Sequence, residues 1–223
     1  MKKKISLISA IILFAMFVQA QGISFGLRGG VNFQNINGSD ANDNTLKNDI
    51  LIGYHIGVNA EIPIVPEFYF QPGLLYTLKG NKSEDVFAGQ TINSTTKISY
   101  LELDLNFLYK PLLGNGHLLL GFGPYVGYGI GGNVKNEGGG LNQTEDIKFK
   151  NTIEITDPQN VTYVRPLDIG ANLLAGYEFG NKISFQLNAQ LGLVKINPEE
   201  EGITDDKSSA KNTGFGFSLG YRF

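Results

Sequence analysis

Charged side chains recur inside stretches of this chain that are otherwise apolar or rich in glycine, and they are the residues that could do chemistry. They share the parity of the glycines and alternate with large apolar residues. The set comprises Arg28, His55, Glu61, Glu102, Asp104, Asp168, Glu178 and Arg222. Carboxylates and imidazole can transfer protons or line an ion path, whereas opposite charges can neutralise one another as an internal polar network. We expect the internal network, with a gated ion path as the alternative.

Enzyme and metal chemistry find little support in the remaining polar residues. The chain has two histidines, His55 and His117, and no cysteine. Neither histidine has the spacing of a Ser-His-acid triad or of a histidine-rich metal centre. A loop at 196–210 is acidic, with Glu199, Glu200, Glu201, Asp205 and Asp206, but it lacks the ordered spacing of a cation site. We therefore predict no catalytic residue, no metal and no cofactor.

The elements that carry these side chains are predicted strands, because successive side chains of a strand point to opposite faces. The last segment shows the alternation well, with Phe215, Phe217 and Leu219 on one parity and small residues on the other. The eight predicted strands span 22–34, 50–61, 68–80, 97–109, 117–130, 163–179, 182–195 and 211–223. Long polar loops at 35–49, 81–96, 131–162 and 196–210 alternate with short turns. Within 131–162, residues 147–149 and 153–155 indicate an additional hairpin.

The two faces of these strands decide the fold class. In a soluble lipocalin-like barrel, the apolar parity would form the core and the other parity would face water. That second parity is rich in glycine and only modestly charged, which makes it a poor water-exposed surface. In a membrane barrel the apolar parity faces lipid, and the polar parity fills an interior just wide enough for side chains. In an antiparallel meander all four long loops lie at one rim. We predict an all-β, eight-stranded antiparallel up-and-down transmembrane β-barrel.

The first twenty residues predict export. Three lysines precede an apolar run from Ile5 to Val18, and Ala20 ends a segment typical of a cleavage site. We expect a cleaved signal peptide at 1–20 and a single barrel domain at 21–223, located in a bacterial outer membrane. The signal segment holds three of the 18 basic residues and none of the 21 acidic ones, so the mature formal charge is −6. Such a chain is an unlikely partner for nucleic acid.

Basic side chains also lie just beyond the apolar band at the long-loop rim. They are Lys97, Arg165, Lys195 and Lys211. Long cationic side chains at this level can snorkel to the membrane interface. The sharper hypothesis is that they contact the phosphates of outer-leaflet lipopolysaccharide, with Arg165, Lys195 and Lys211 as one cluster.

The order and spacing of six motifs resemble the PorT-like outer-membrane β-barrel proteins of Bacteroidota. The motifs are GLRGGVNFQNI (26–36), FYFQPGLLYTLKG (68–80), SYLELDLNFLYKP (99–111), LLGFGPYVGYGIGG (119–132), DIGANLLAGYEFG (168–180) and FSLGYRF (217–223). The resemblance implies an outer-membrane location and a closing strand, with Tyr221 and Phe223, that the barrel-assembly machinery reads as its signal. It implies no chemistry. We expect a monomeric, non-enzymatic scaffold with extracellular loops, and keep two alternatives, a small-solute or ion channel and a lipid-modifying enzyme.

Overall fold

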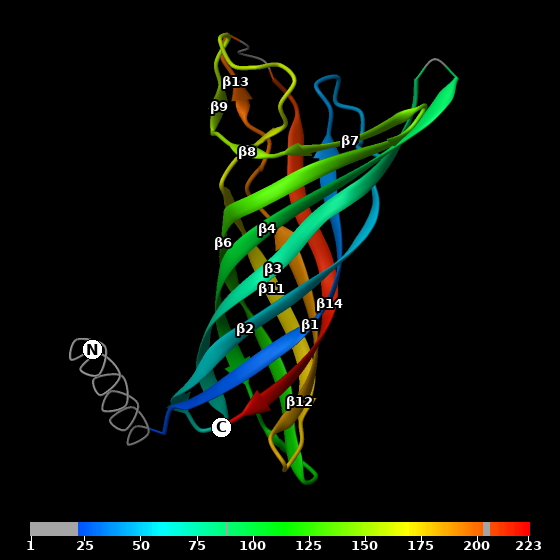
Figure 1. Ribbon diagram of the computed structural model, residues 1–223. Helices are drawn as coiled ribbons and strands as arrows, with labels where there is room; N and C mark the ends of the chain where they lie inside the picture. The colour runs from blue at the N-terminus through cyan, green and yellow to red at the C-terminus, as the bar shows by residue number, and fades with distance from the viewer. Residues whose placement is uncertain (1–21, 88, 203–205) are drawn as a thin grey trace, which may run out of the picture.

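The computed structural model describes residues 22–87, 89–202 and 206–223, and the predicted signal segment lies outside them. Eight antiparallel strands form a closed ring, because β6 pairs with β11 in addition to its other neighbours. The ring strands are β1 (Ser24–Ser39), β2 (Asp49–Val65), β3 (Phe68–Phe87), β4 (Gln90–Tyr109), β6 (Gly116–Gly138), β11 (Leu167–Glu178), β12 (Ile183–Gly192) and β14 (Ser209–Arg222). Figure 1 shows them inclined around one axis. The predicted eight-stranded barrel is confirmed.

The first and last strands close the ring. β14 pairs with β1 from Gly26↔Arg222 to Ser39↔Ser209, and on its other side it pairs with β12. The terminal Phe223 donates its backbone N–H to the carbonyl of Phe25 (2.8 Å). Closure gives every ring strand two hydrogen-bonded neighbours, so the ring leaves no open edge, as a barrel in lipid requires.

The two ends of the barrel differ. At one end lie the short turns β2–β3, β4–β6 and β11–β12, together with the chain's C-terminus (Figure 1). The two-residue strand β5 (Leu112–Leu113) folds back on β6 there. Outward-facing aromatic pairs ring this end, including Phe68 on Tyr109 with ring centroids 4.7 Å apart and Tyr221 against Phe223 at 5.4 Å. Such pairs are typical of the girdle at a membrane interface.

The wall separates an apolar outer face from a mostly polar interior. Ile56, Leu173 and Phe217 are among the outward side chains that are more than half exposed, whereas Glu102, Asp104 and other interior polar residues are buried. The parity predicted to face lipid is therefore the outer one. Among the described residues, no helix is long and apolar enough to span a membrane.

Strands β3, β4 and β6 continue past the barrel as a projecting sheet, to which β7 (Leu141–Asp146) is added (Figure 1). The sequence predicted a polar loop at 81–96, and that prediction is wrong. β3 and β4 stay paired out to Phe87↔Gln90. Above the apolar band both faces of a strand meet water, so no apolar alternation marks it. The close pairing of β3 with β4 requires glycine at position 80, because φ there is +140° and a Cβ would lie 2.0 Å from the Thr96 carbonyl oxygen.

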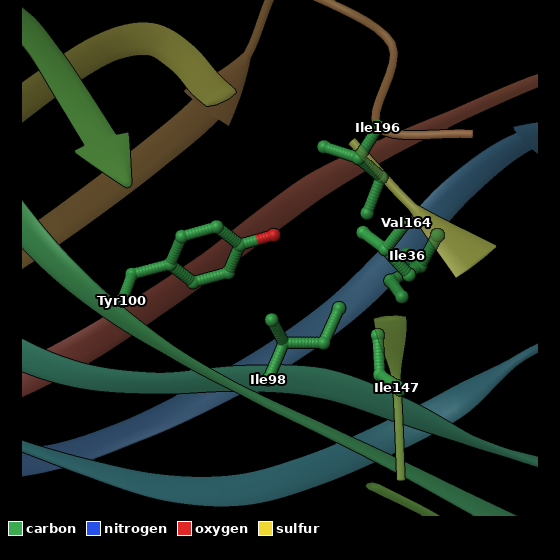
Figure 2. Close-up of a cluster of buried hydrophobic side chains, with 6 residues drawn as sticks. All are labelled: Ile36, Ile98, Tyr100, Ile147, Val164 and Ile196. Carbon is green, nitrogen blue, oxygen red and sulfur yellow. The ribbon is translucent and has the colours of Figure 1, made fainter. Parts of the chain in front are cut away.

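The described parts of the connections from β7 to β11 and from β12 to β14 cover the barrel mouth as a cap. β8 (Lys148–Phe149) pairs in parallel with β10 (Tyr163–Val164), and β9 (Thr152–Ile153) with β13 (Glu199–Glu200). The hairpin predicted between 147–149 and 153–155 is therefore wrong, because both segments pair with more distant chain. Figure 2 shows Ile147, Val164 and Ile196 of the cap facing Ile98 and Tyr100 of the barrel wall. These side chains exclude water from the mouth.

A surface ion pair pins the cap loop. Lys150 Nζ donates a hydrogen bond to Asp157 Oδ2 (2.6 Å), and Asp157 also accepts the backbone N–H of Glu154 (2.7 Å). The hydrogen bond with Asp157 raises the pKa of Lys150, and the same bond lowers the pKa of Asp157. The pair therefore stays charged at neutral pH, and it is lost when acid protonates Asp157 or strong base deprotonates Lys150.

Two adjacent glycines of β1 test the assignment of the faces. A Cβ at inward Gly30 would lie 1.8 Å from the Phe217 carbonyl oxygen, whereas at outward Gly29 its nearest neighbour is 3.5 Å away. Gly30→Ala should therefore separate β1 from β14 and impair barrel closure, while Gly29→Ala should be tolerated. The heat-dependent shift in gel mobility that marks a folded barrel reports the difference. Equal folded fractions for the two variants would contradict this assignment.

Candidate functional site: a filled lumen

The interior of the barrel is organised around Lys79, whose side chain is fully buried. Lys79 Nζ lies 2.6 Å from Glu102 Oε2 and donates a hydrogen bond to Asp168 Oδ2 at 3.0 Å. The three residues come from β3, β4 and β11, and none is more than 2% exposed. Buried charges persist when they are paired and hydrogen-bonded. The contact therefore links three strands across the lumen with a net charge of −1.

Polar and aromatic side chains complete the coordination of this triad. Tyr125 donates its hydroxyl to Asp168 Oδ1 (3.1 Å), and Asn212 Nδ2 donates to Asp168 Oδ2 (3.0 Å). The ring centroid of Tyr125 lies 4.0 Å from Lys79 Nζ, a cation–π distance. Tyr100 lies beside them and accepts from Asn212 at 3.3 Å. These contacts fix the acceptors around the ammonium group.

A second ion pair neutralises the next layer towards the short-turn end. Arg28 of β1 pairs with Asp104 of β4 across the lumen, and both side chains are buried. Gln190 of β12 donates to Glu102 Oε1 at 2.6 Å, which links β12 to the Lys79 triad. Together with Tyr125 and Asn212, these contacts involve side chains from β1, β3, β4, β6, β11, β12 and β14, seven of the eight ring strands.

His55 occupies the same level and bridges two neutral partners. Its Nδ1 lies 2.6 Å from Asn32 Oδ1 and its Nε2 lies 2.7 Å from Ser218 Oγ. The sequence spacing did not suggest this Ser–His–Asn arrangement, which has the contacts of a hydrolytic triad. However, all three side chains are buried, and Ser218 donates its own hydroxyl to Asn188 Oδ1 (3.1 Å). The arrangement serves as a hydrogen-bond chain and offers no access to a substrate.

A third charged layer closes the lumen at the short-turn end. Lys110 Nζ donates to Glu61 Oε2 and to Glu178 Oε2, each at 2.9 Å. Arg222 donates to Glu61 Oε1 (2.5 Å) and to Asn59 Oδ1 (2.7 Å), and its Nε lies 3.9 Å from Glu178. The charges of the two cations, Lys110 and Arg222, therefore balance those of the two carboxylates, Glu61 and Glu178.

An apolar layer lies between this charged end and the middle of the lumen. Leu108, Leu119 and Leu174 are buried there and pack together with Tyr69. Beside His55 and Arg28 the interior leaves a cavity of about 10 Å³, enough for at most about one water molecule. Charged layers, leucines and the hydrophobic cap together fill the described length of the barrel.

All eight interior residues predicted from sequence lie inside the lumen. Arg28 contacts Asp104, and Arg222 contacts Glu61 and lies near Glu178. Lys79 bridges Glu102 and Asp168. The predicted polar network did not include the cations Lys79 and Lys110 or the tyrosines Tyr100 and Tyr125. Lys79 shares the parity of Gln71 and Thr77, and that signal could have found it.

The predicted basic rim is divided between two places. Arg165 and Lys195 lie in neighbouring segments, because Arg165 donates its N–H to the Ile196 carbonyl (2.7 Å), and the Ile196 N–H reaches the carbonyl of Ala210, beside Lys211. Arg165 is held by Glu199 at 2.7 Å. Lys97 belongs instead to the projecting sheet. Among the described residues, no group of acidic or histidine side chains is arranged to hold a metal, and Asp205 lies outside them.

Removing the Lys79 charge should destabilise the barrel strongly. Lys79→Met leaves Glu102 and Asp168 buried without their shared cation, which costs about 3–5 kcal/mol when a buried pair is broken. Urea unfolding in detergent micelles, followed by far-UV circular dichroism, measures the loss. Lys82→Met, three residues along the same strand at an exposed position, serves as the control and should change stability little. Equal unfolding midpoints for the two variants would refute the role assigned to Lys79.

Comparison with known proteins places this architecture in a family. The chain matches the family described as outer membrane protein beta-barrel domain over residues 19–197. A search of curated proteins found no match. The Yersinia pestis attachment invasion locus protein Ail, solved with the heparin analogue sucrose octasulfate, is 12% identical with a TM-score of 0.41, covering 90% of this chain and 99% of Ail.

Two further solved structures resemble the chain at a similar level. Neisserial surface protein A is 13% identical with a TM-score of 0.37, covering 89% of this chain and 95% of the other. The outer membrane enzyme PagL is 12% identical with a TM-score of 0.33, covering 86% and 98%. These likenesses assign no activity. The family match spans most of the chain and agrees with the closed ring of strands, so the protein belongs to the outer-membrane β-barrel family.

Proposed function

We propose that the protein is a non-enzymatic outer-membrane scaffold whose barrel is closed and whose extracellular sheet and loops bind partners. The observation that carries this proposal is the filled lumen. Lys79, Glu102 and Asp168 occupy its middle with almost no exposure, and the cap covers the long-loop mouth. A barrel of this kind leaves its outer surfaces as the places for specificity.

A channel is less well supported than a scaffold. Conduction requires a continuous water-filled path lined by groups that bind ions weakly enough to release them. Here the interior charges are paired with one another, and the leucine layer of Leu108, Leu119 and Leu174 adds an apolar barrier. Opening a path would require breaking several buried pairs.

A lipid-modifying enzyme is also less well supported. The Ser218–His55–Asn32 contacts lie inside the wall, whereas a lipid substrate would approach from the outer face. Catalysis needs a reacting atom of the substrate within reach of the nucleophile, and the buried Ser218 hydroxyl is out of reach of such a substrate.

The finer placement of the protein also belongs to this proposal. We assign it to the PorT-like members of the family on the six motifs that follow one another along the strands. The proposal includes export through a cleaved signal peptide, recognition of Tyr221 and Phe223 by the barrel-assembly machinery, and a monomer in contact with outer-membrane lipid and lipopolysaccharide. Tyr221 and Phe223 are exposed at the end of β14, where an assembly factor could reach them.

Planar-bilayer recordings of the refolded mature chain test the closed barrel. We expect no sustained open conductance from the wild type. Glu102→Ala removes one acceptor of Lys79 and should lower thermal stability more than it changes conductance. Lys47→Ala, at an exposed loop position, is the matched control for both measurements. A large and stable open pore in the wild type would overturn the closed-barrel proposal.

A further inference from the structure

Three lysines lie on the outer face of the projecting sheet in two adjacent cross-strand rows. One row pairs Lys82 with Thr95, Thr95 with Lys135, and Lys135 with Thr144. The next row pairs Lys97 with Asn133. Residues directly opposite on antiparallel strands share one face. These six side chains line a groove of about 360 Å³, which we call the lysine groove.

The lysine groove lies directly above the band that faces lipid. Exposed Ile52 of that band borders it. Tyr54 and Tyr76 pack with centroids 5.9 Å apart, and the Tyr76 hydroxyl is 2.8 Å from Ser99 Oγ. Tyrosines of this kind lie at the level of the headgroups. Lys97 is two residues beyond Ser99, roughly 7 Å along a strand that rises about 3.3 Å per residue.

The groove holds cationic groups that the described protein leaves available. Lys135 donates to Glu137 at 2.7 Å. Lys82 and Lys97 are exposed and form no ion pair with any residue the structure describes. Asp146 continues the row of Lys97 and Asn133, and Glu84 lies on the same face in the row of Glu137, but neither lines the groove. The groove therefore presents three ammonium groups against one carboxylate.

This set of donors matches a phosphorylated ligand. An ammonium group on a flexible stem is a strong point charge for phosphate oxygens, and the hydroxyls of Thr95 and Thr144 and the amide of Asn133 can donate further hydrogen bonds. The adjacent lipid-facing surface fits a ligand that carries acyl chains as well as phosphate. The charge of the mature chain is negative overall, so these lysines stand out locally.

We propose that the lysine groove binds the phosphate groups of a glycolipid in the outer leaflet, with its acyl chains against the wall below Ile52. Lys82 and Lys97 contact phosphate, and Lys135 is positioned by Glu137. This proposal rests on the outer-membrane placement and does not require a closed lumen. Of the basic residues expected to contact lipopolysaccharide, the proposal keeps Lys97 and leaves out Arg165, which Glu199 already holds.

Native mass spectrometry of the detergent-solubilised mature chain tests the proposal with bisphosphorylated lipid A as probe. The wild type should bind this lipid more tightly than it binds the same lipid after treatment with phosphatase. The double variant Lys82→Gln/Lys97→Gln should bind it roughly tenfold more weakly, as expected for two exposed ion pairs. The matched control Lys47→Gln/Lys207→Gln removes the same charge from exposed positions on the same rim and should bind like the wild type. Heat-dependent gel mobility confirms that each variant is folded.

The outcomes separate the sources of phosphate. Equal retention by the two double variants, or equal retention of the dephosphorylated lipid, would overturn the proposal. Displacement of lipid A by an equimolar amount of inorganic phosphate would show a free-anion site and also overturn the lipid assignment. Preference for phosphatidylglycerol over lipid A would overturn the assignment of the ligand as a glycolipid. Because conductance is measured separately, a failure here is distinguishable from an open barrel.

Discussion

The burial of charge inside a narrow barrel is the constraint on which this structure depends. Lys79 on β3 is removed from water, and desolvation of an ammonium group costs several kcal/mol unless acceptors surround it. Glu102 and Asp168 supply those acceptors from β4 and β11. The interaction exists only when the ring is closed and these strands face one another. Strand order and lumen chemistry are therefore coupled, because an incorrect register would leave carboxylates buried without their cation.

The same constraint explains which parts of the site could be predicted from sequence. Inside the membrane a side chain either faces lipid or faces the lumen, so parity alone placed residues such as Arg28 and Glu178. Parity does not specify which charges meet, because partners such as Arg28 and Asp104 are 76 residues apart. Lys110 was not predicted as an interior residue, because it lies just past the last residue of β4, in a segment predicted as a turn. Inward leucines such as Leu108 escaped because the polar parity was taken to be uniformly polar.

Above the membrane, the rule that made the strands predictable no longer holds. Residues 81–96 are polar on both faces, so a paired strand there has the composition of a loop. The cap shows a second limit. Its short strands pair in parallel with partners such as Val164 and Glu200, which follow long intervening chain. Only their burial against Ile98 and Tyr100 explains the arrangement, and that burial depends on where the barrel mouth lies.

A closed lumen changes where function must be sought. The interior groups that could do chemistry are committed to one another, so reactivity there would compete with stability. The projecting sheet has no such conflict. Its strands are continuous with β3, β4 and β6, and the barrel therefore holds its face at a fixed height and angle to the membrane. A groove such as that of Lys82 and Lys97 is then pre-organised for a ligand at the interface, which lowers the entropy cost of binding.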